Sequence, residues 1–566
     1  MRRLLAVFFL VLIVQQACAL AFPYRHFVPR CPKCEQALAA SSILILGLSV
    51  NASEFDDSVT VSWRTNRPSS SYLVLWQEGV GGVRPYFDSS MNLSHSFRLE
   101  SFAPNTTYRF YVQSSASGWP AAISDTRQFT TPESLRIFNE SVEVSPFGTE
   151  AVLRWQTSRL STSGAEFWCN GGLYENKSDD SLTTSHEIAA SRLHVGNNCE
   201  ARFWSTRAAA AVSSRLSFDT PRPGLLLVLS PDFANDSEVQ VAAGNYLTAV
   251  FFDLRWQGYF LGLNASTNNA AYIDEVITRM HSENNVLAVV AVGDDLAFPR
   301  VEVSYVTPML DGWSNTTRPS DAYLRILNTS VAEWVDWDVV VSLVVPTSTC
   351  APYCPTKQAK AAAVLRKFAA NRTVDYGSRV ELFRDPSFTP DLDGLDAFEN
   401  VSEHTSVSGS ALAYVSCSAE ACPQLAMLVA DGHGNPGTVS IPPGQVNYLD
   451  IKGVNVPLVI LSGCDTAAWF HAPGMSTPVN QWFGDLVTES NYVRAVIAGS
   501  PLVRSSLEID PDPASVISYA VPRLAAGKPL AEALWGSRVA VFYPVSHTGS
   551  TIVVFGDPTF HYNPSH

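Results

Sequence analysis

Two short apolar runs late in the chain constrain its fold more than any other feature. The first, LAMLVADGHGN, begins at Leu425 and ends in a glycine-flanked loop that carries His433. The second, VPLVILSGC, ends in a loop that carries Cys464. Each run is typical of a buried parallel strand that ends in a loop at its carboxyl end. If the two strands are neighbours in one parallel sheet, His433 and Cys464 emerge at the same edge, where open α/β sheets bind ligands.

The sequence around these runs alternates between strand and helix patterns from Pro223 onward. The runs GLLLVLSPDF, NVLAVVAVGDD, DVVVSLVVP, YVRAVIAGSP and STIVVFGDPTF all read as buried strands. One face of a helix is marked by Tyr272, Ile273, Val276, Ile277 and Met280. An alanine-rich helix is expected from about Thr356 to Ala370, with Thr356 as its N-cap. The pattern predicts an α/β domain over residues 223–566, with a mostly parallel sheet and helices on both faces.

The preceding part of the chain has a β-type pattern that occurs twice. Residues 41–132 contain short runs in which apolar residues alternate with polar ones, separated by turn residues, as in a β-sandwich. Trp63 lies in VTVSWRT, and Tyr108 follows the turn in LESFAPNTTYRFYV. This region resembles fibronectin type III domains, in which these two positions are core residues. Residues 133–222 repeat the order with Trp155, without a clear counterpart of Tyr108.

Length and charge limit the class of protein. A chain of 566 residues is too long for one core and predicts several domains. A net charge of -15 argues against nucleic acid as a partner, because binding phosphate needs a basic surface. Residues 1–19 read as a secretory signal peptide, with an uncleaved anchor as the alternative, and residues 20–40 form an N-terminal segment. Because no later run is long enough for a membrane span, we expect a secreted protein.

The density of N-glycosylation sequons also favours export. All of them lie before the two runs that carry His433 and Cys464. Their asparagines are Asn51, Asn92, Asn105, Asn139, Asn176, Asn235, Asn264, Asn315, Asn328, Asn371 and Asn400.

The cysteines single out one thiol. Ten cysteines less Cys18 in the signal leave nine, and an exported protein is expected to pair them. Cys464 is the one left over, and a free thiol in an oxidising compartment is either buried or used. The others form four local pairs: Cys31 with Cys34, Cys169 with Cys199, Cys350 with Cys354, and Cys417 with Cys422. Connectivity does not follow from sequence alone, and Cys31 with Cys34 could instead form a redox motif or half a metal site.

The order of motifs in residues 223–566 resembles the gingipain-type family of caspase-fold cysteine peptidases. The motifs are a strand ending in Gly293-Asp294, an S-D-x-Y segment, DGHGN, LSGC, and a final strand ending in GDPT. The resemblance implies a caspase-like domain and an endopeptidase acting on a protein or peptide substrate. It also implies that no cofactor is required for the chemistry, while structural calcium is allowed for. The family's immunoglobulin-like domain follows its catalytic one, whereas here two β-domains come first.

Carried over by position, Cys464 is the nucleophile and His433 its partner. The imidazole lowers the pKa of the thiol and protonates the leaving amine. The backbone N–H groups of Gly434 and Cys464 form the oxyanion hole in this reading, each typically worth about 3 kcal/mol. Five acids could bind calcium or a basic side chain, and none is assigned to a pocket: Asp321, Asp336, Asp338, Asp431 and Asp465.

Two other functions are compatible with the same residues. One is a catalytically inactive caspase-fold protein that serves adhesion or recognition, binding a cell-surface or matrix ligand through the fibronectin-like domains. The other is a metallophosphoesterase, because fibronectin-like domains precede purple acid phosphatases, and Gly293-Asp294 and Gly432-His433 resemble fragments of their metal ligands. The residue preference at the cleaved bond and the oligomeric state do not follow from the sequence.

Overall fold

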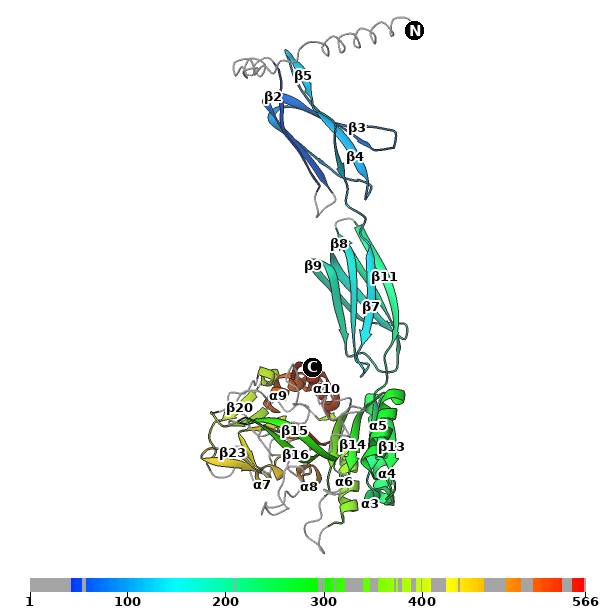
Figure 1. Ribbon diagram of the computed structural model, residues 1–566, viewed down its shortest axis with the longest axis vertical. Helices are drawn as coiled ribbons and strands as arrows, with labels where there is room; N and C mark the ends of the chain where they lie inside the picture. The colour runs from blue at the N-terminus through cyan, green and yellow to red at the C-terminus, as the bar shows by residue number, and fades with distance from the viewer. Residues whose placement is uncertain are drawn as a thin grey trace.

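The structure is a computed structural model with three units arranged along its long axis (Figure 1). We name them the first β-unit (β1 to β6), the second β-unit (β7 to β11) and the α/β unit (β12 to β28). The residues described are 42–52, 58–207, 210–293, 298, 301–309, 312–320, 339–346, 355–370, 373–374, 379–387, 393–398, 400–408, 424–435, 438–462, 485–499, 513–541 and 552–563. The expected signal peptide lies outside them.

Each β-unit is a curled antiparallel sheet that encloses a core of its own. The first contains β1 (Ile45–Ala52), β2 (Val59–Gln77), β3 (Arg84–Leu99), β4 (Thr107–Ala116), β5 (Trp119–Ile123) and β6 (Arg127–Thr130). The second contains β7 (Ile137–Val144), β8 (Glu150–Cys169), β9 (Gly172–Ser191), β10 (Asn198–Arg207) and β11 (Ala210–Asp219). In both, one long strand carries two sets of partners. The first part of β2 pairs with β1 and its last part with β4, so the strand serves both sides of the curled sheet.

The two β-units differ at one cross-strand position in the core. In the first, the Tyr108 hydroxyl accepts a hydrogen bond from Ala103 N at 3.0 Å, as in the tyrosine corner of fibronectin-like domains. Tyr108 lies opposite Gln77 on the neighbouring strand. In the second, the matching pair is Cys199 opposite Cys169, and the two form a disulfide. The predicted pairing of these two cysteines is therefore confirmed, and it takes the place of the missing tyrosine.

The α/β unit is built on a ten-stranded sheet, and eight of its nine strand pairs are parallel. The sheet order is β13-β12-β14-β17-β27-β26-β25-β21-β19-β20. Five strands form one parallel half: β12 (Gly224–Leu229), β13 (Gln257–Gly262), β14 (Val286–Val292), β17 (Val340–Val344) and β27 (Ile552–Gly556). Five form the other: β19 (Arg379–Arg384), β20 (Asn400–His404), β21 (Met427–Asp431), β25 (Leu458–Ser462) and β26 (Ala495–Gly499). The halves run in opposite directions and meet at the antiparallel pair β26 and β27.

Helices cover the sheet as the alternating pattern predicts. They are α3 (Pro231–Ala234), α4 (Ser237–Leu254), α5 (Ala270–Asn284), α6 (Lys357–Ala369), α7 (Tyr448–Lys452), α8 (Asp485–Glu489), α9 (Pro513–Ala525), α10 (Leu530–Val541) and the 3-10 helix η2 (Asp393–Ala397). The Thr356 hydroxyl caps α6 by accepting from Ala359 N at 3.1 Å, as expected. The crossovers through α4 and α5 run in opposite directions along the sheet. Because crossovers are right-handed, these two helices lie on opposite faces.

Three small sheets complete the unit. They are β15 (Val301–Met309) with β16 (Gly312–Ser320), β18 (Thr373–Val374) with β28 (His561–Tyr562), and β22 (His433–Asn435) with β23 (Thr438–Ile441) and β24 (Gly444–Asn447). Among the described residues, no helix is both long and apolar enough to cross a membrane.

The second β-unit docks onto the α/β unit through the loop between β7 and β8. Phe147 of this loop is 1% exposed and belongs to the α/β core. Its ring centroid is 5.4 Å from that of Trp256 and 5.8 Å from that of Trp535. Beside it, Lys528 Nζ lies 3.0 Å from a carboxylate oxygen of Glu150 and 2.8 Å from one of Glu532. This interface joins an apolar anchor to a partly buried ionic cluster.

Candidate functional site

The strands that precede His433 and Cys464 are neighbours in the sheet. β21 and β25 pair in parallel, with Asp431 opposite Ser462 at their carboxyl ends. Gly432 N donates to Ser462 O at 2.9 Å, so the pairing continues to the point where both strands end. Both strands therefore end at the same edge of the sheet, two residues before His433 and Cys464 in the sequence. Cys464 itself lies outside the described residues.

His433 begins a small antiparallel sheet. It pairs with Ser440 of β23, and Gly434 pairs with Val439. The turn into this sheet requires glycine at position 432, because a Cβ there would lie 2.3 Å from the Ser440 carbonyl oxygen. The close approach of two backbone segments thus fixes where β22 starts relative to the sheet edge.

Buried polar residues line the same edge. Asp431 is fully buried at the end of β21, Ser462 is 1% exposed at the end of β25, and Asp385, just after β19, is 5% exposed. Asp385 N donates to Asp431 O at 2.9 Å, and a carboxylate oxygen of Asp385 accepts from the Ser387 hydroxyl at 2.7 Å. Asp385 and Ser462 are not among the residues predicted from the sequence, and Asp431 is predicted to have no pocket role. The available signal was a polar residue directly after an apolar run, as in VELFRD and VILS.

Several other predicted site residues cannot be placed. Asp321, Asp336, Asp338 and Asp465 lie outside the described residues, as do Cys31, Cys34, Cys350, Cys354, Cys417 and Cys422. No group of three or more His, Cys, Asp or Glu in the described part of the chain could hold a metal ion. Eight of the sequon asparagines have described side chains, and all eight are exposed, as glycan attachment requires: Asn51, Asn92, Asn105, Asn139, Asn176, Asn235, Asn264 and Asn400. Asn328 and Asn371, and the side chain of Asn315, lie outside the described part.

Lys367 is a lysine of α6 whose amine is hydrogen-bonded to backbone carbonyl groups. Lys367 Nζ donates to the carbonyl oxygens of Ser490 at 3.0 Å and Val493 at 2.8 Å, in the segment between α8 and β26. Desolvation of the amine, followed by the nearby charge of Arg494, lowers the pKa of Lys367 to about 7, while Asp557 acts in the opposite direction. The group thus links α6 to the start of β26 and titrates near neutral pH.

The outer face of the first β-unit carries several aromatic side chains. Tyr72 of β2 contacts Phe87 of β3 with ring centroids 6.2 Å apart, and Trp76 contacts Tyr111 of β4 at 6.3 Å. Phe87 is 65% exposed. On the matching face of the second β-unit, the positions of Tyr72, Val74 and Tyr111 are taken by Gly164, Glu166 and Arg202. Arg202 lies over the Trp168 ring at 4.3 Å and pairs with Glu200.

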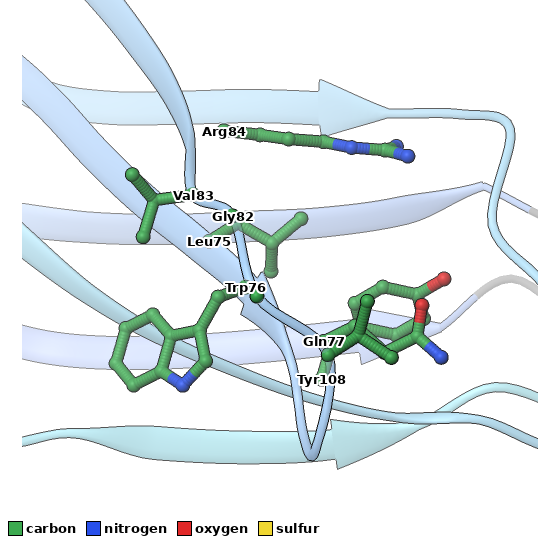
Figure 2. Close-up of a pocket in the computed structure, with 9 residues that line it drawn as sticks. Leu75, Trp76, Gln77, Gly82, Val83, Arg84 and Tyr108 are labelled. Carbon is green, nitrogen blue, oxygen red and sulfur yellow. The ribbon is translucent and has the colours of Figure 1, made fainter.

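A cavity of about 290 Å³ opens at the end of this outer face. It is lined by Trp76 and Tyr108, by Arg84 and by the Gly81-Gly82 turn between β2 and β3. Figure 2 shows the indole of Trp76 and the side chains of Val83 and Arg84 around it. The described structure thus offers a second candidate surface, far along the chain from His433.

Comparison with known proteins assigns no family. No protein-family model matches the chain, and no curated protein matches it. Among solved structures, it is similar to a crystal structure of the chicken CNTN1 FN1-FN3 domains, with 13% sequence identity. That match covers 32% of this chain and 69% of the other, with a TM-score of 0.19, and at this score it carries no argument about fold or function.

Proposed function

We propose that the protein is a secreted cysteine endopeptidase of the gingipain type. In this proposal, a Cys464 and His433 dyad lies on a caspase-like α/β domain that follows two fibronectin type III-like domains. The observation that supports it best is the pairing of Asp431 with Ser462 in adjacent parallel strands. In the sequence, each of these strands ends two residues before a member of the proposed dyad, and the pairing supports a common sheet edge for a nucleophile and its proton donor.

The proposed reaction proceeds through a thioester. The thiolate of Cys464 attacks the scissile carbonyl carbon, and the backbone N–H groups of Gly434 and Cys464 stabilise the oxyanion. The C–N bond breaks as the His433 imidazolium gives its proton to the leaving amine. Water then hydrolyses the thioester, returning the thiol and releasing the carboxyl product. The chemistry uses only groups of this chain and water.

A thiol-directed experiment tests the proposal. The secreted protein is assayed against a positional peptide library before and after treatment with a peptide-linked electrophile, and the labelled residue is identified by mass spectrometry. We expect one modification, at Cys464, and loss of at least 99% of the cleavage. Cys464→Ala should abolish both. Cleavage that persists in Cys464→Ala, or that chelators abolish while the electrophile has no effect, would exclude the assignment.

A second function is favoured by the outer face of the first β-unit. We propose that this face binds a protein ligand on a cell surface or in the matrix, because aromatic side chains grouped on one outer face, with Phe87 65% exposed, are typical of protein interfaces. Ile123 of β5 is 62% exposed and lies opposite Gln113 of β4. Phe87→Ser with Ile123→Ser should weaken binding of the secreted protein to matrix-coated surfaces at least tenfold. Phe138→Ser, at an exposed position of the second β-unit, is the matched control. Equal binding by all three proteins would rule out this face.

A further inference from the structure

Each β-unit buries a histidine within a cluster of hydroxyl groups, and the two clusters match residue by residue. In the first, His95 Nδ1 lies 2.7 Å from the Ser71 hydroxyl, and Nε2 lies 2.9 Å from that of Thr65. In the second, His186 Nδ1 lies 2.7 Å from Ser163, and Nε2 lies 2.8 Å from Thr157.

The stacking partners of the two histidines match as well. His95 stacks on Trp63 with ring centroids 5.1 Å apart, and His186 stacks on Trp155 at 5.0 Å. The sequence shows the repeat as W-x-T-x-x-x-S-x-S on β2 and again on β8.

The clusters lie where the long strands bend. The pairing of β2 with β3 shifts register between Arg64 and Ser69 and again before Ser71. The pairing of β8 with β9 shifts between Gln156 and Ser161 and again before Ser163. Each imidazole therefore bridges hydroxyls on both sides of the corner that lets one strand serve both sides of its sheet.

The hydrogen bonds favour one neutral tautomer of each ring, in which Nε2 also lies near a second hydroxyl, that of Ser69 at 3.3 Å or Ser161 at 3.4 Å. The Thr65 hydroxyl donates to the Arg67 carbonyl at 2.8 Å, so its oxygen accepts from Nε2–H of His95. Nδ1 then carries no proton and accepts from the Ser71 hydroxyl. Thr157 repeats the arrangement by donating to the Arg159 carbonyl at 2.8 Å. A second proton on the ring would turn Nδ1 from an acceptor into a donor, so the serine hydroxyl could no longer donate to it and would have to turn and accept instead.

We propose that His95 and His186 are matched acid-sensitive latches, which hold the strand corners while neutral and release them when protonated. The proposal is independent of the peptidase activity, because it concerns only the two β-units.

The charges around the clusters favour the neutral ring. Among the described residues, the charged side chains near these corners include Asp88 and Arg67 in the first β-unit, and Asp179, Arg159 and Arg207 in the second. Burial lowers the pKa of both histidines from 6.5, and Asp88 and Asp179 oppose this by a smaller amount. The folded units thus bind fewer protons than the unfolded chain does. The stability that these two histidines contribute is therefore fully present above about pH 6.5 and is lost as the pH drops through the folded-state pKa.

Hydrogen exchange of the whole secreted chain, followed by mass spectrometry, tests the latches. Peptides covering residues 65–71 and 157–163 should exchange at least fivefold faster at pH 5 than at pH 7, after correction for the intrinsic rate. The double variant His95→Gln with His186→Gln keeps a neutral donor and acceptor and should lose this dependence. His194→Gln, at an exposed position of the second β-unit, should keep it. The same pH dependence in the double variant, or none in the natural chain, overturns the proposal.

A second pair of variants covers the case in which the glutamine variant does not fold. Ser71→Ala with Ser163→Ala removes the hydroxyls that donate to Nδ1, so each ring takes up a proton more easily. The pH at which exchange accelerates should then rise by at least half a unit. An unchanged midpoint contradicts the latch.

Discussion

At the residue scale, the two β-units show how one core position can be stabilised by two kinds of chemistry. Tyr108 holds its turn with a hydroxyl that accepts from Ala103 N. Cys199 holds the same position by a covalent bond across the strand pair. The disulfide links residues 30 apart, whereas the tyrosine hydrogen bond links residues five apart. Because the disulfide persists when the protein unfolds, it also restricts the unfolded chain.

Replacing Tyr108 with phenylalanine should destabilise the first β-unit by about 1 kcal/mol, because Ala103 N–H loses its acceptor while the ring is kept. Urea unfolding followed through tryptophan fluorescence measures the change. Tyr111→Phe, whose ring lies on the outer face, should change the free energy of unfolding by less than about 0.5 kcal/mol. Equal effects of the two substitutions would show that the hydroxyl of Tyr108 does not stabilise the turn.

The low pKa of Lys367 predicts that the stability of the α/β unit depends on pH. Its folded-state pKa of about 7 lies below the value of 10.5 in the unfolded chain. Between these values the unfolded chain binds a proton that the folded chain does not. Stability therefore falls as the pH is lowered from about 10 to about 7, by at most about 1.4 kcal/mol per unit. Thermal unfolding of Lys367→Met should lack this part of the slope, and an unchanged slope would contradict the low pKa.

At the scale of elements, the sequence predicted local structure well and long-range order poorly. The apolar runs identified β12, β14, β21 and β25 because a fully buried strand needs no partner to be recognised. The order of the strands depends on contacts between distant segments, so nothing in STIVVFGDPTF showed that it occupies the middle of the sheet. The neighbouring positions of β21 and β25 could be proposed only because the loops after them carry His433 and Cys464, which suggested one catalytic site. The buried histidine clusters were missed because serine, threonine and histidine on a strand usually indicate an exposed face.

We predict that the candidate site requires glycine at position 432, because two backbone segments pack closely there. Gly432→Ala places a methyl group 2.3 Å from the Ser440 carbonyl oxygen, so β22 must move away from the sheet edge. We expect at least a tenfold loss of kcat/KM in the proposed peptide cleavage, because a displacement of about 1 Å at a catalytic group can cost about a hundredfold. Gly453→Ala, where a Cβ meets nothing within 4 Å, is the control and should keep full activity. Similar activity of the two variants would show that the turn does not position His433.

At the scale of the whole molecule, the second β-unit and the α/β unit share a core. Phe147 is supplied by one and buried in the other, between Trp256 and Trp535. The partly buried cluster of Lys528, Glu150 and Glu532 lies beside it. We expect the second β-unit to keep a fixed orientation relative to the α/β unit, because the Phe147 anchor and the ionic contacts of Lys528 act together.

Phe147→Ala should cost about 3 kcal/mol and separate the unfolding of the two units. Differential scanning calorimetry should show one shared transition for these units in the natural protein and two in the variant. Phe138→Ala, in the same β-unit but 41% exposed, should leave the shared transition in place. One transition in both variants would mean that the units are joined by other contacts.

The antiparallel meeting of β26 and β27 has a consequence for biosynthesis. β27 lies between β17 and β26, yet it follows β17 by about two hundred residues and is the last strand of the large sheet to leave the ribosome. Until it is made, each parallel half has an open hydrogen-bonding edge in the middle of the future sheet, and such edges invite wrong partners. A chain of this kind therefore depends on chaperones to cover both edges until its closing strand is made.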